Sequence, residues 1–159
     1  MLTLFHGSNN PELKRITNKP SAAGQQFGGL FFAADRKIAA SHGPHVYVVE
    51  LSPNDVASSG SLAFGNDEED EELIDAILSE EFGSTDDEWR ALVLEEEEEA
   101  FEEEVAPEDW AEFSWEGQRV RGRIAREFGY SAVEMSDEHG TSYLVFPGTR
   151  LRAARDEDK

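Results

Sequence analysis

Two neighbouring carboxylates, Asp137 and Glu138, and the early motif His6-Gly7-Ser8 are the residues of this sequence whose types best suit chemistry. Asp137 and Glu138 belong to the polar stretch 136–141 between two apolar runs, a pattern that predicts the tip of a β-hairpin. Adjacent carboxylates at such a tip can stabilise a positively charged group. A structural alternative stays open, since an Asp in a tight turn also bonds its own backbone in an Asx-type turn.

His6 and a pair of phenylalanines are the next candidates. The apolar run Leu2–Phe5 predicts a short strand that delivers His6 at its end, where the imidazole can hydrogen-bond a ligand or merely cap a turn. Phe31 and Phe32 alternate across a second predicted strand, so one side chain points into the core and the other can face a cleft. An ordinary core strand explains each phenylalanine equally well.

The elements that must position these residues follow from periodicity and capping. A longer helix is predicted where Val120, Ile124 and Phe128 recur at i, i+4 and i+8, because this spacing creates one apolar face. Asp35 can cap a short helix, and Asn10 followed by Pro11 predicts another helix start. The predicted helices therefore span 36–40 and 114–129, and the predicted strands span 2–5, 30–33, 46–51, 132–135 and 142–146.

Charge is distributed very unevenly along the 159 residues, whose formal net charge is −21. Residues 66–112 hold 23 Asp and Glu against the base Arg90, whereas the rest of the chain holds 12 acids and 13 bases. Such a block repels nucleic acid, because phosphates are bound by Lys and Arg, but it can meet a basic protein surface. Apolar residues at helical spacing predict that residues 57–112 form an acidic, largely helical insert docked through that face.

Several functional classes are excluded or disfavoured by composition. The absence of cysteine excludes disulfides, cysteine-ligated metals and a thiol nucleophile. The sequence has neither a P-loop nor a Rossmann glycine motif, and its histidines and acids show no compact ligand spacing, so no metal is expected. Apolar runs are too short to span a membrane and the start lacks the features of a secretory signal, so we expect a cytoplasmic protein without a membrane partner.

Three segments, taken in order, resemble the diphtheria-toxin and poly-ADP-ribose-polymerase branch of the ADP-ribosyltransferases. They are His6-Gly7-Ser8, the stretch FGGLFFA at 27–33 followed by AASH at 39–42, and the predicted C-terminal hairpin. The run SWEGQRVRGRIAREFGYSAVEMSDEHGTSYLVFPG at 114–148 is similar, more closely, to the anti-CRISPR ADP-ribosyltransferases that disable the type I-F surveillance complex. The resemblance lies at the two ends of the chain and leaves out residues 54–112.

This resemblance implies the fold class, the domain organisation and the donor substrate. It implies an α+β fold, a small ADP-ribosyltransferase domain over residues 1–159 with two packed, mostly antiparallel sheets around an NAD cleft. It implies NAD as the ADP-ribose donor, with His6 on a ribose hydroxyl and the backbone of Gly7 on the nicotinamide amide, which an absent Cβ lets approach closely. The NAD-binding residues that it implies are His6, Gly7, Ser8, Phe31, Phe32 and His42.

The catalytic carboxylate is where the sequence departs from the polymerase branch. Ser142 occupies the position of that branch's glutamate, so the negative charge opposite the oxocarbenium-like transition state must come from elsewhere. The anti-CRISPR resemblance implies Asp137 as this acid, with Glu138 sharing the role or holding a ribose hydroxyl. Glu134 on the preceding strand is a weaker candidate.

Three arginines on the helix 114–129 allow two interpretations. Arg119, Arg121 and Arg123 can clamp the phosphates of NAD, or they can pair on the helix surface with the acidic insert. Pairing with the insert is the favoured interpretation.

The leading functional hypothesis is mono-ADP-ribosylation of a partner protein. By resemblance, the target is a type I-F surveillance-complex subunit at the site that reads the protospacer-adjacent motif. The acidic insert would mimic the charge of DNA and steer the enzyme to that basic, nucleic-acid-binding surface, although a merely solubilising face explains the charge equally well. Two alternatives remain: a non-catalytic acidic decoy for a nucleic-acid-binding protein, and an ADP-ribosyltransferase toxin or effector with another target.

Overall fold

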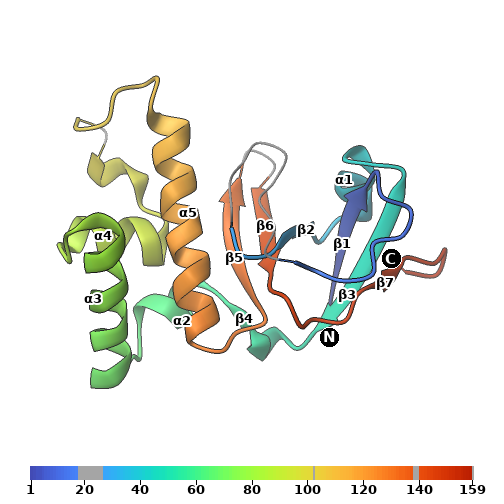
Figure 1. Cartoon of the computed structure of the whole chain (residues 1–159), viewed down its shortest axis with the longest axis horizontal. Coiled ribbons are helices and arrows are strands. Elements are labelled where there is room, and N and C mark those ends of the chain that lie inside the picture. Colours follow the sequence, from blue (N-terminus) through green and yellow to red (C-terminus); the bar gives the residue numbers. More distant parts are fainter. Residues whose placement is uncertain (18–26, 102, 138–139, 159) are drawn as a thin grey trace.

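The computed structural model describes residues 1–17, 27–101, 103–137 and 140–158, and within them a seven-stranded sheet lies beside a group of helices (Figure 1). The strands are β1 (Leu2–Ser8), β2 (Leu30–Ala33), β3 (His45–Leu51), β4 (Val56–Ala57), β5 (Ala132–Asp137), β6 (Gly140–Val145) and β7 (Arg152–Ala153). The helices are α1 (Arg36–Ser41), α2 (Ser59–Ala63), α3 (Glu68–Phe82), α4 (Asp87–Arg90) and α5 (Trp110–Glu127), with the short segments η1 (Pro53–Asp55), η2 (Ala91–Glu95) and η3 (Glu98–Phe101). The predicted α+β class is confirmed.

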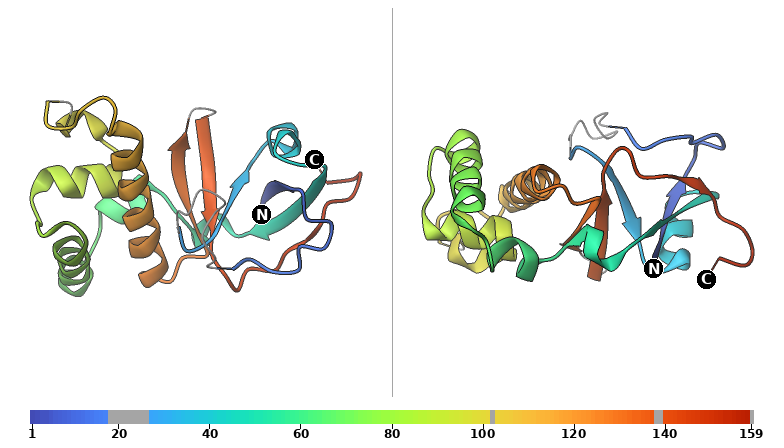
Figure 2. Two further views of the ribbon diagram at one scale, coloured as in Figure 1. Left: turned by 45° about the horizontal axis from the view of Figure 1, so that its top comes forward. Right: turned by 90° about the horizontal axis from the view of Figure 1, so that it is seen from below.

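The described strands form one sheet in the order β4-β5-β6-β2-β1-β3-β7, so the expectation of two packed sheets is wrong. The neighbouring strands are antiparallel apart from β4 and β5, as predicted for most of them. The two halves of the sheet stay connected because β1 meets β2 at one described register pair, Phe5↔Ala33. Away from this seam they diverge, and β1 and β3 run at an angle to β5 and β6 (Figure 2).

The main core lies between the sheet and the helices. Val120 and Ile124 of α5 are fully buried, as their spacing predicts, and they pack with residues of β5, β6 and α3. Phe128, the third residue of the predicted stripe, packs against the edge of this core. Buried residues of this core outside α5 include Leu62, Ile74, Ile77, Leu78, Val93, Val133 and Leu144.

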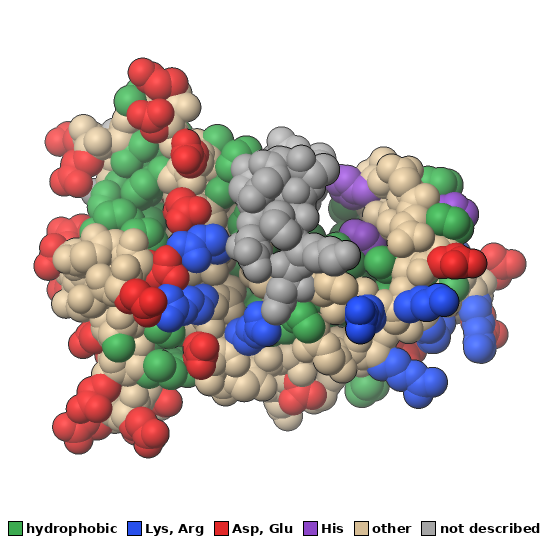
Figure 3. Space-filling model, in the orientation of Figure 1, with side chains coloured by type: hydrophobic (Ala, Val, Ile, Leu, Met, Phe, Trp, Pro, Cys, Tyr) green, Lys and Arg blue, Asp and Glu red, His purple; other side chains and the backbone are tan. Residues whose placement is uncertain are grey.

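The predicted acidic insert, residues 57–112 and called the acidic segment below, packs on α5 through apolar side chains, as expected. Its boundaries as an insert remain a prediction. Trp89 stacks on Phe82 with ring centroids 4.1 Å apart and also contacts Phe101 and Phe113. Acidic side chains gather over this helical end of the molecule (Figure 3). Of the helices within the described residues, none is long and apolar enough to cross a membrane.

Two helix boundaries differ from those predicted. α5 begins at Trp110 rather than after Ser114, because Trp110 stacks on Phe113 at 5.6 Å and extends the aromatic contacts by a turn. No helix starts at Asn10. The Asn10 Oδ1 instead accepts a hydrogen bond from the Glu12 backbone N–H at 2.9 Å, which closes a turn.

Candidate active site

A cavity of about 450 Å³ lies where the two halves of the sheet diverge, between α1 and α5. Its described lining comes from β1, β2, α1, α5, β5 and β6, with Phe27 before β2 and His42 after α1. Six predicted site residues meet there, namely His6, Gly7, Phe31, Phe32, His42 and Asp137. The volume and the mixture of aromatic walls with a few polar groups are typical of a small-molecule site.

His6 lies inside β1 rather than at its end, because that strand continues to Ser8 through backbone pairing with β3. Its Nδ1 lies 2.7 Å from the carbonyl oxygen of Phe31, which can only accept a hydrogen bond. Nδ1 therefore carries the proton, and in the neutral ring Nε2 is an acceptor. Burial lowers the pKa of His6; the bond to Phe31 opposes this shift and the nearby His42 adds to it. The site thus favours a neutral imidazole with one acceptor nitrogen.

Gly7 is required by packing against α1. A Cβ at this position would lie 1.8 Å from the carbonyl oxygen of Ala39 and 2.8 Å from its carbon. The close contact brings α1 against β1, so that Ile38, Ala39 and His42 reach the cavity. The sequence suggested that glycine here leaves room for a ligand; the structure adds that only glycine leaves room for the backbone of Ala39.

The aromatic wall is formed by both phenylalanines of β2. Phe32 is 2% exposed and its ring centroid lies 5.4 Å from that of His6. Phe31 meets Phe27 edge to face at 5.0 Å and packs against the main core. Both line the cavity, whereas strand alternation predicted that one of them would face the cleft.

The carboxylate side of the cavity comes from the C-terminal hairpin. Asp137 ends β5, is exposed and lines the cavity together with Ser142 of β6, whose hydroxyl donates to the Met135 carbonyl at 3.4 Å. Glu138 lies outside the described residues. The carboxylate of Glu134 is not among the described groups that line the cavity.

Of the predicted site residues with described positions, Ser8 is the one that the cavity lining leaves out. It ends β1, and its hydroxyl oxygen accepts a hydrogen bond from the Asn10 backbone N–H at 3.1 Å. The position of Ser8 is therefore that of a residue that orders the turn after the strand.

Sequence reasoning missed two lining residues on α5, Trp115 and Gln118. They are three positions apart and therefore share a helix face, away from the buried Val120 and Ile124. Trp115 is 43% exposed. A large aromatic residue on the polar side of an amphipathic helix was the signal that could have identified this face.

A second hollow of about 600 Å³ adjoins the cavity on the side of the acidic segment. The two hollows share Trp115, Gln118 and Asp137, and the second is also lined by Glu96 and Glu98. Despite these acids, no group of three or more His, Asp or Glu that could hold a metal occurs among the described residues.

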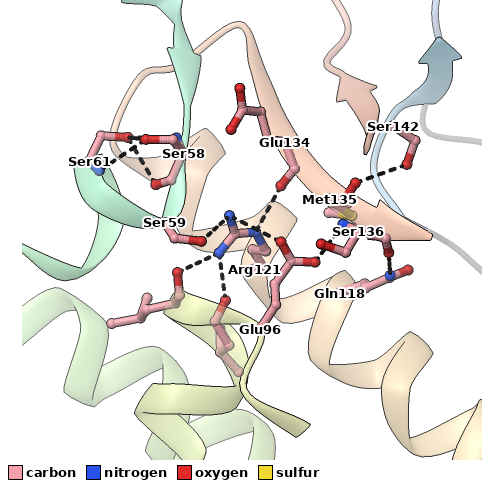
Figure 4. A network of polar contacts seen from close by, with 12 residues as sticks. Ser58, Ser59, Ser61, Glu96, Gln118, Arg121, Glu134, Met135, Ser136 and Ser142 are labelled. Carbon is pink, nitrogen blue, oxygen red and sulfur yellow. Dashed lines mark hydrogen bonds and ion pairs between the residues drawn. The ribbon is translucent and has the colours of Figure 1, made fainter. Parts of the chain in front are cut away.

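Arg119, Arg121 and Arg123 of α5 contact the acidic segment. Arg119 forms an ion pair with Glu81, which raises the pKa of that arginine, and Arg123 contacts the same carboxylate at 2.5 Å. Arg121 differs from the expected surface residue: it is 1% exposed and donates to the backbone carbonyls of residues 93, 94 and 134 (Figure 4). The expected pairing with the acidic segment is therefore found, with Arg121 as an internal connector.

Comparisons with known proteins agree with this geometry. A family model for the anti-CRISPR type I-F ADP-ribosyltransferase AcrIF11 matches residues 2–154. A solved structure described as the crystal structure of an anti-CRISPR protein is 28% identical, with a TM-score of 0.64, covering 96% of this chain and 94% of that one. The curated proteins give no match. The chain therefore belongs to the anti-CRISPR type I-F ADP-ribosyltransferase family and is an NAD-dependent mono-ADP-ribosyltransferase.

Proposed function

We propose that the chain binds NAD in the cavity between α1 and α5 and transfers ADP-ribose to a partner protein. The observation that carries this proposal is the convergence of His6, Phe31, Phe32 and Asp137 on one cavity of about 450 Å³. These residues come from both ends of the chain and from both halves of the sheet.

Each side of the cavity has a defined task in this proposal. The acceptor Nε2 of His6 receives a hydrogen bond from a ribose hydroxyl, and the backbone of Gly7 pairs with the nicotinamide amide. Phe31, Phe32 and His42 form the wall against which the nicotinamide ring lies. NAD is thereby held with its glycosidic bond between the wall and the C-terminal hairpin, which restricts its orientation before reaction.

Asp137 supplies the negative charge that faces the ribose when the glycosidic bond breaks. The transition state resembles an oxocarbenium ion, and a fixed carboxylate near it lowers the barrier. Nicotinamide leaves as a neutral molecule, so no acid is needed to protonate it. Glu138 is a second proposed carboxylate, sharing this role or holding a ribose hydroxyl.

The proposed target is a subunit of the type I-F surveillance complex, at the basic surface that reads the protospacer-adjacent motif. The acidic segment supports this choice, because residues 66–112 carry 23 acids against one base and present many of them on the outer face of the helices. A surface of this charge attracts a basic partner and speeds its association at low ionic strength.

The test is transfer of label from NAD to protein. Purified chain and labelled NAD are incubated with a lysate containing a type I-F complex, and labelled bands are identified by mass spectrometry. Wild type is expected to label one subunit, and Asp137→Asn to abolish the band. The exposed Asp156→Asn is the matched control and should label as wild type does. Nicotinamide release without a protein band would point to another acceptor.

The role of the acidic segment needs its own variant. Deleting residues 67–104 would remove Ile74, Ile77 and Leu78 from the main core, so it tests folding rather than steering. Replacing the exposed Glu68, Glu69 and Glu72 with Gln keeps the core and removes three charges. Slower target labelling with unchanged nicotinamide release supports steering; equal labelling contradicts it.

A second candidate function, a stoichiometric acidic decoy, is favoured by the same concentration of charge. A decoy acts without NAD and retains its effect in Asp137→Asn. Inhibition of the surveillance complex should therefore be compared with and without NAD, and inhibition that needs NAD excludes the decoy.

A further inference from the structure

Along its edge away from β6, β5 is paired with β4 at first and with side chains in the residues that lead to Asp137. β4 pairs with β5 at Ala132 and Val133, and the described ladder between these two strands ends there. Alternate residues of an antiparallel strand direct their backbone groups to the same side, and Glu134 and Ser136 direct theirs away from β6. Beyond Val133 these groups have no described strand partner on this side of β5, so side chains can bond them.

Side chains take the place of the missing strand (Figure 4). Arg121 Nε donates to the Glu134 carbonyl at 2.9 Å, and the Ser136 backbone N–H donates to Glu96 Oε2 at 2.7 Å. Gln118 Nε2 donates to the Ser136 carbonyl at 2.9 Å. Both the N–H and the carbonyl of Ser136 are thus bonded by side chains, one residue before Asp137.

Arg121 links this edge to the acidic segment. It is 1% exposed, and besides Glu134 it donates to the carbonyl of Leu94 at 2.5 Å and to the hydroxyl of Ser59 at 3.3 Å. Its guanidinium lies 3.6 Å from the Glu96 carboxylate. Burial lowers the pKa of Arg121, and the charge of Glu96 opposes that shift. Glu96 is therefore fixed between a buried cation and the Ser136 backbone N–H.

The backbone of Glu96 has a left-handed conformation that glutamate rarely adopts, and the contacts of its carboxylate account for a glutamate at this position. Its φ is 59°, and among the described residues it is the non-glycine residue with a positive φ. Glycine or asparagine adopts this conformation at lower cost. Neither could carry a carboxylate to Arg121 and Ser136. A glutamate at a position that disfavours it indicates that the carboxylate itself is needed.

We propose that Glu96, a residue of the acidic segment, is a positioning residue that aims Asp137 into the cavity by holding the backbone of Ser136. This inference rests on the proposed function, in which Asp137 faces the ribose. Glu96 acts through the backbone and has no contact with the reacting atoms. The acidic segment then contributes to catalysis as well as to surface charge.

Steady-state nicotinamide release from NAD tests the inference in the full chain. Because a displacement of about 1 Å can cost about 100-fold in rate, Glu96→Ala should lower kcat at least tenfold while KM for NAD changes little. Glu96→Gln keeps an acceptor oxygen for Ser136 and loses only the charge, so its kcat should fall by roughly threefold. The exposed Glu97→Ala changes the neighbouring charge and should behave as wild type.

Glu96→Gly separates positioning from stability. Glycine relieves the left-handed backbone, so this variant should unfold at a higher temperature than Glu96→Ala yet lose as much kcat. A merely structural role predicts that kcat follows the unfolding temperature across the variants, and that result would overturn the inference. So would a kcat of Glu96→Ala equal to that of Glu97→Ala. Wild type that releases no nicotinamide would instead overturn the proposed function, a distinguishable result.

Discussion

Gly7→Ala is the substitution whose outcome the structure determines most directly. The added Cβ would lie 1.8 Å from the Ala39 carbonyl oxygen, whereas ordinary contacts begin near 3.4 Å. The obstructing atoms are backbone, so β1 and α1 must separate by more than an ångström. Overpacking of this kind costs about 3 kcal/mol, which for a chain of this size lowers Tm by about 6–12 °C.

The same displacement should damage the site. Ile38 of α1 and His42, which follows the end of that helix, line the cavity, so moving the helix enlarges it on the side of His6. Nicotinamide release should therefore fall by about 100-fold, beyond what loss of folded protein explains. Calorimetry gives Tm, and steady-state release at a temperature where the variant is folded gives kcat.

The matched control is Gly60→Ala in α2. A Cβ there would lie 3.7 Å from the Ser58 hydroxyl oxygen, an ordinary contact. Alanine in a helix is favoured over glycine by about 0.5–1 kcal/mol, so this variant should be slightly stabilised with unchanged activity. Gly7→Ala with the Tm and kcat of wild type would refute the packing argument for Gly7.

Three further predictions concern charge and exposure. The hydrogen-bonded ion pair with Arg119 lowers the pKa of Glu81 below its ordinary 4.5. The stability that this ion pair gives the folded chain is therefore present above pH 4.5 and is lost as the pH falls through the folded pKa. Urea unfolding should show that Glu81→Gln loses less stability than wild type between about pH 5 and pH 3. Burial lowers the pKa of His6 below 6.5, so the unfolded chain binds this proton at a higher pH than the folded chain does. The free energy of unfolding therefore falls as the pH drops from 6.5 toward the pKa of His6 in the folded chain. His6→Gln should lose this dependence of stability on pH, whereas the control His45→Gln, at an exposed position, should keep it. Trp115→Ala should change stability by less than about 1 kcal/mol, because the residue is 43% exposed, yet weaken NAD binding by about tenfold in calorimetric titration.

Much of the fold could be predicted from local pattern. Alternating and apolar runs located β2 and β3 almost to the residue, and the stripe of Val120 and Ile124 identified the buried face of α5. The number of sheets could not be predicted, because it depends on whether Phe5 and Ala33 pair across the seam, a contact between segments 28 positions apart. The start of α5 was missed because ring stacking of Trp110 on Phe113 outweighed the capping preference of Ser114.

The candidate site, like the fold, could be predicted only in part from the sequence. Resemblance brought together residues from both ends of the chain, and the cavity contains six of those with described positions. Arg121 was misplaced on the surface because sequence gives no sign that four backbone and side-chain acceptors surround it. Glu96 was hidden in a run of five glutamates, and only its left-handed backbone and its contact with Ser136 distinguish it.

The seam between β1 and β2 has a consequence for how the protein unfolds. β1 and β3 are paired over seven positions and β5 and β6 over six, whereas the described backbone pairing between β1 and β2 is Phe5↔Ala33, supported by the bond from His6 to the Phe31 carbonyl. Amide protons within each group should exchange slowly, and those beside the seam should exchange sooner, through local opening. A ligand in the cavity touches both groups at once. The binding energy of the ligand then opposes separation of the two groups of strands. Saturating NAD should therefore slow amide exchange at the seam more than elsewhere, and the two groups should unfold in a single thermal transition.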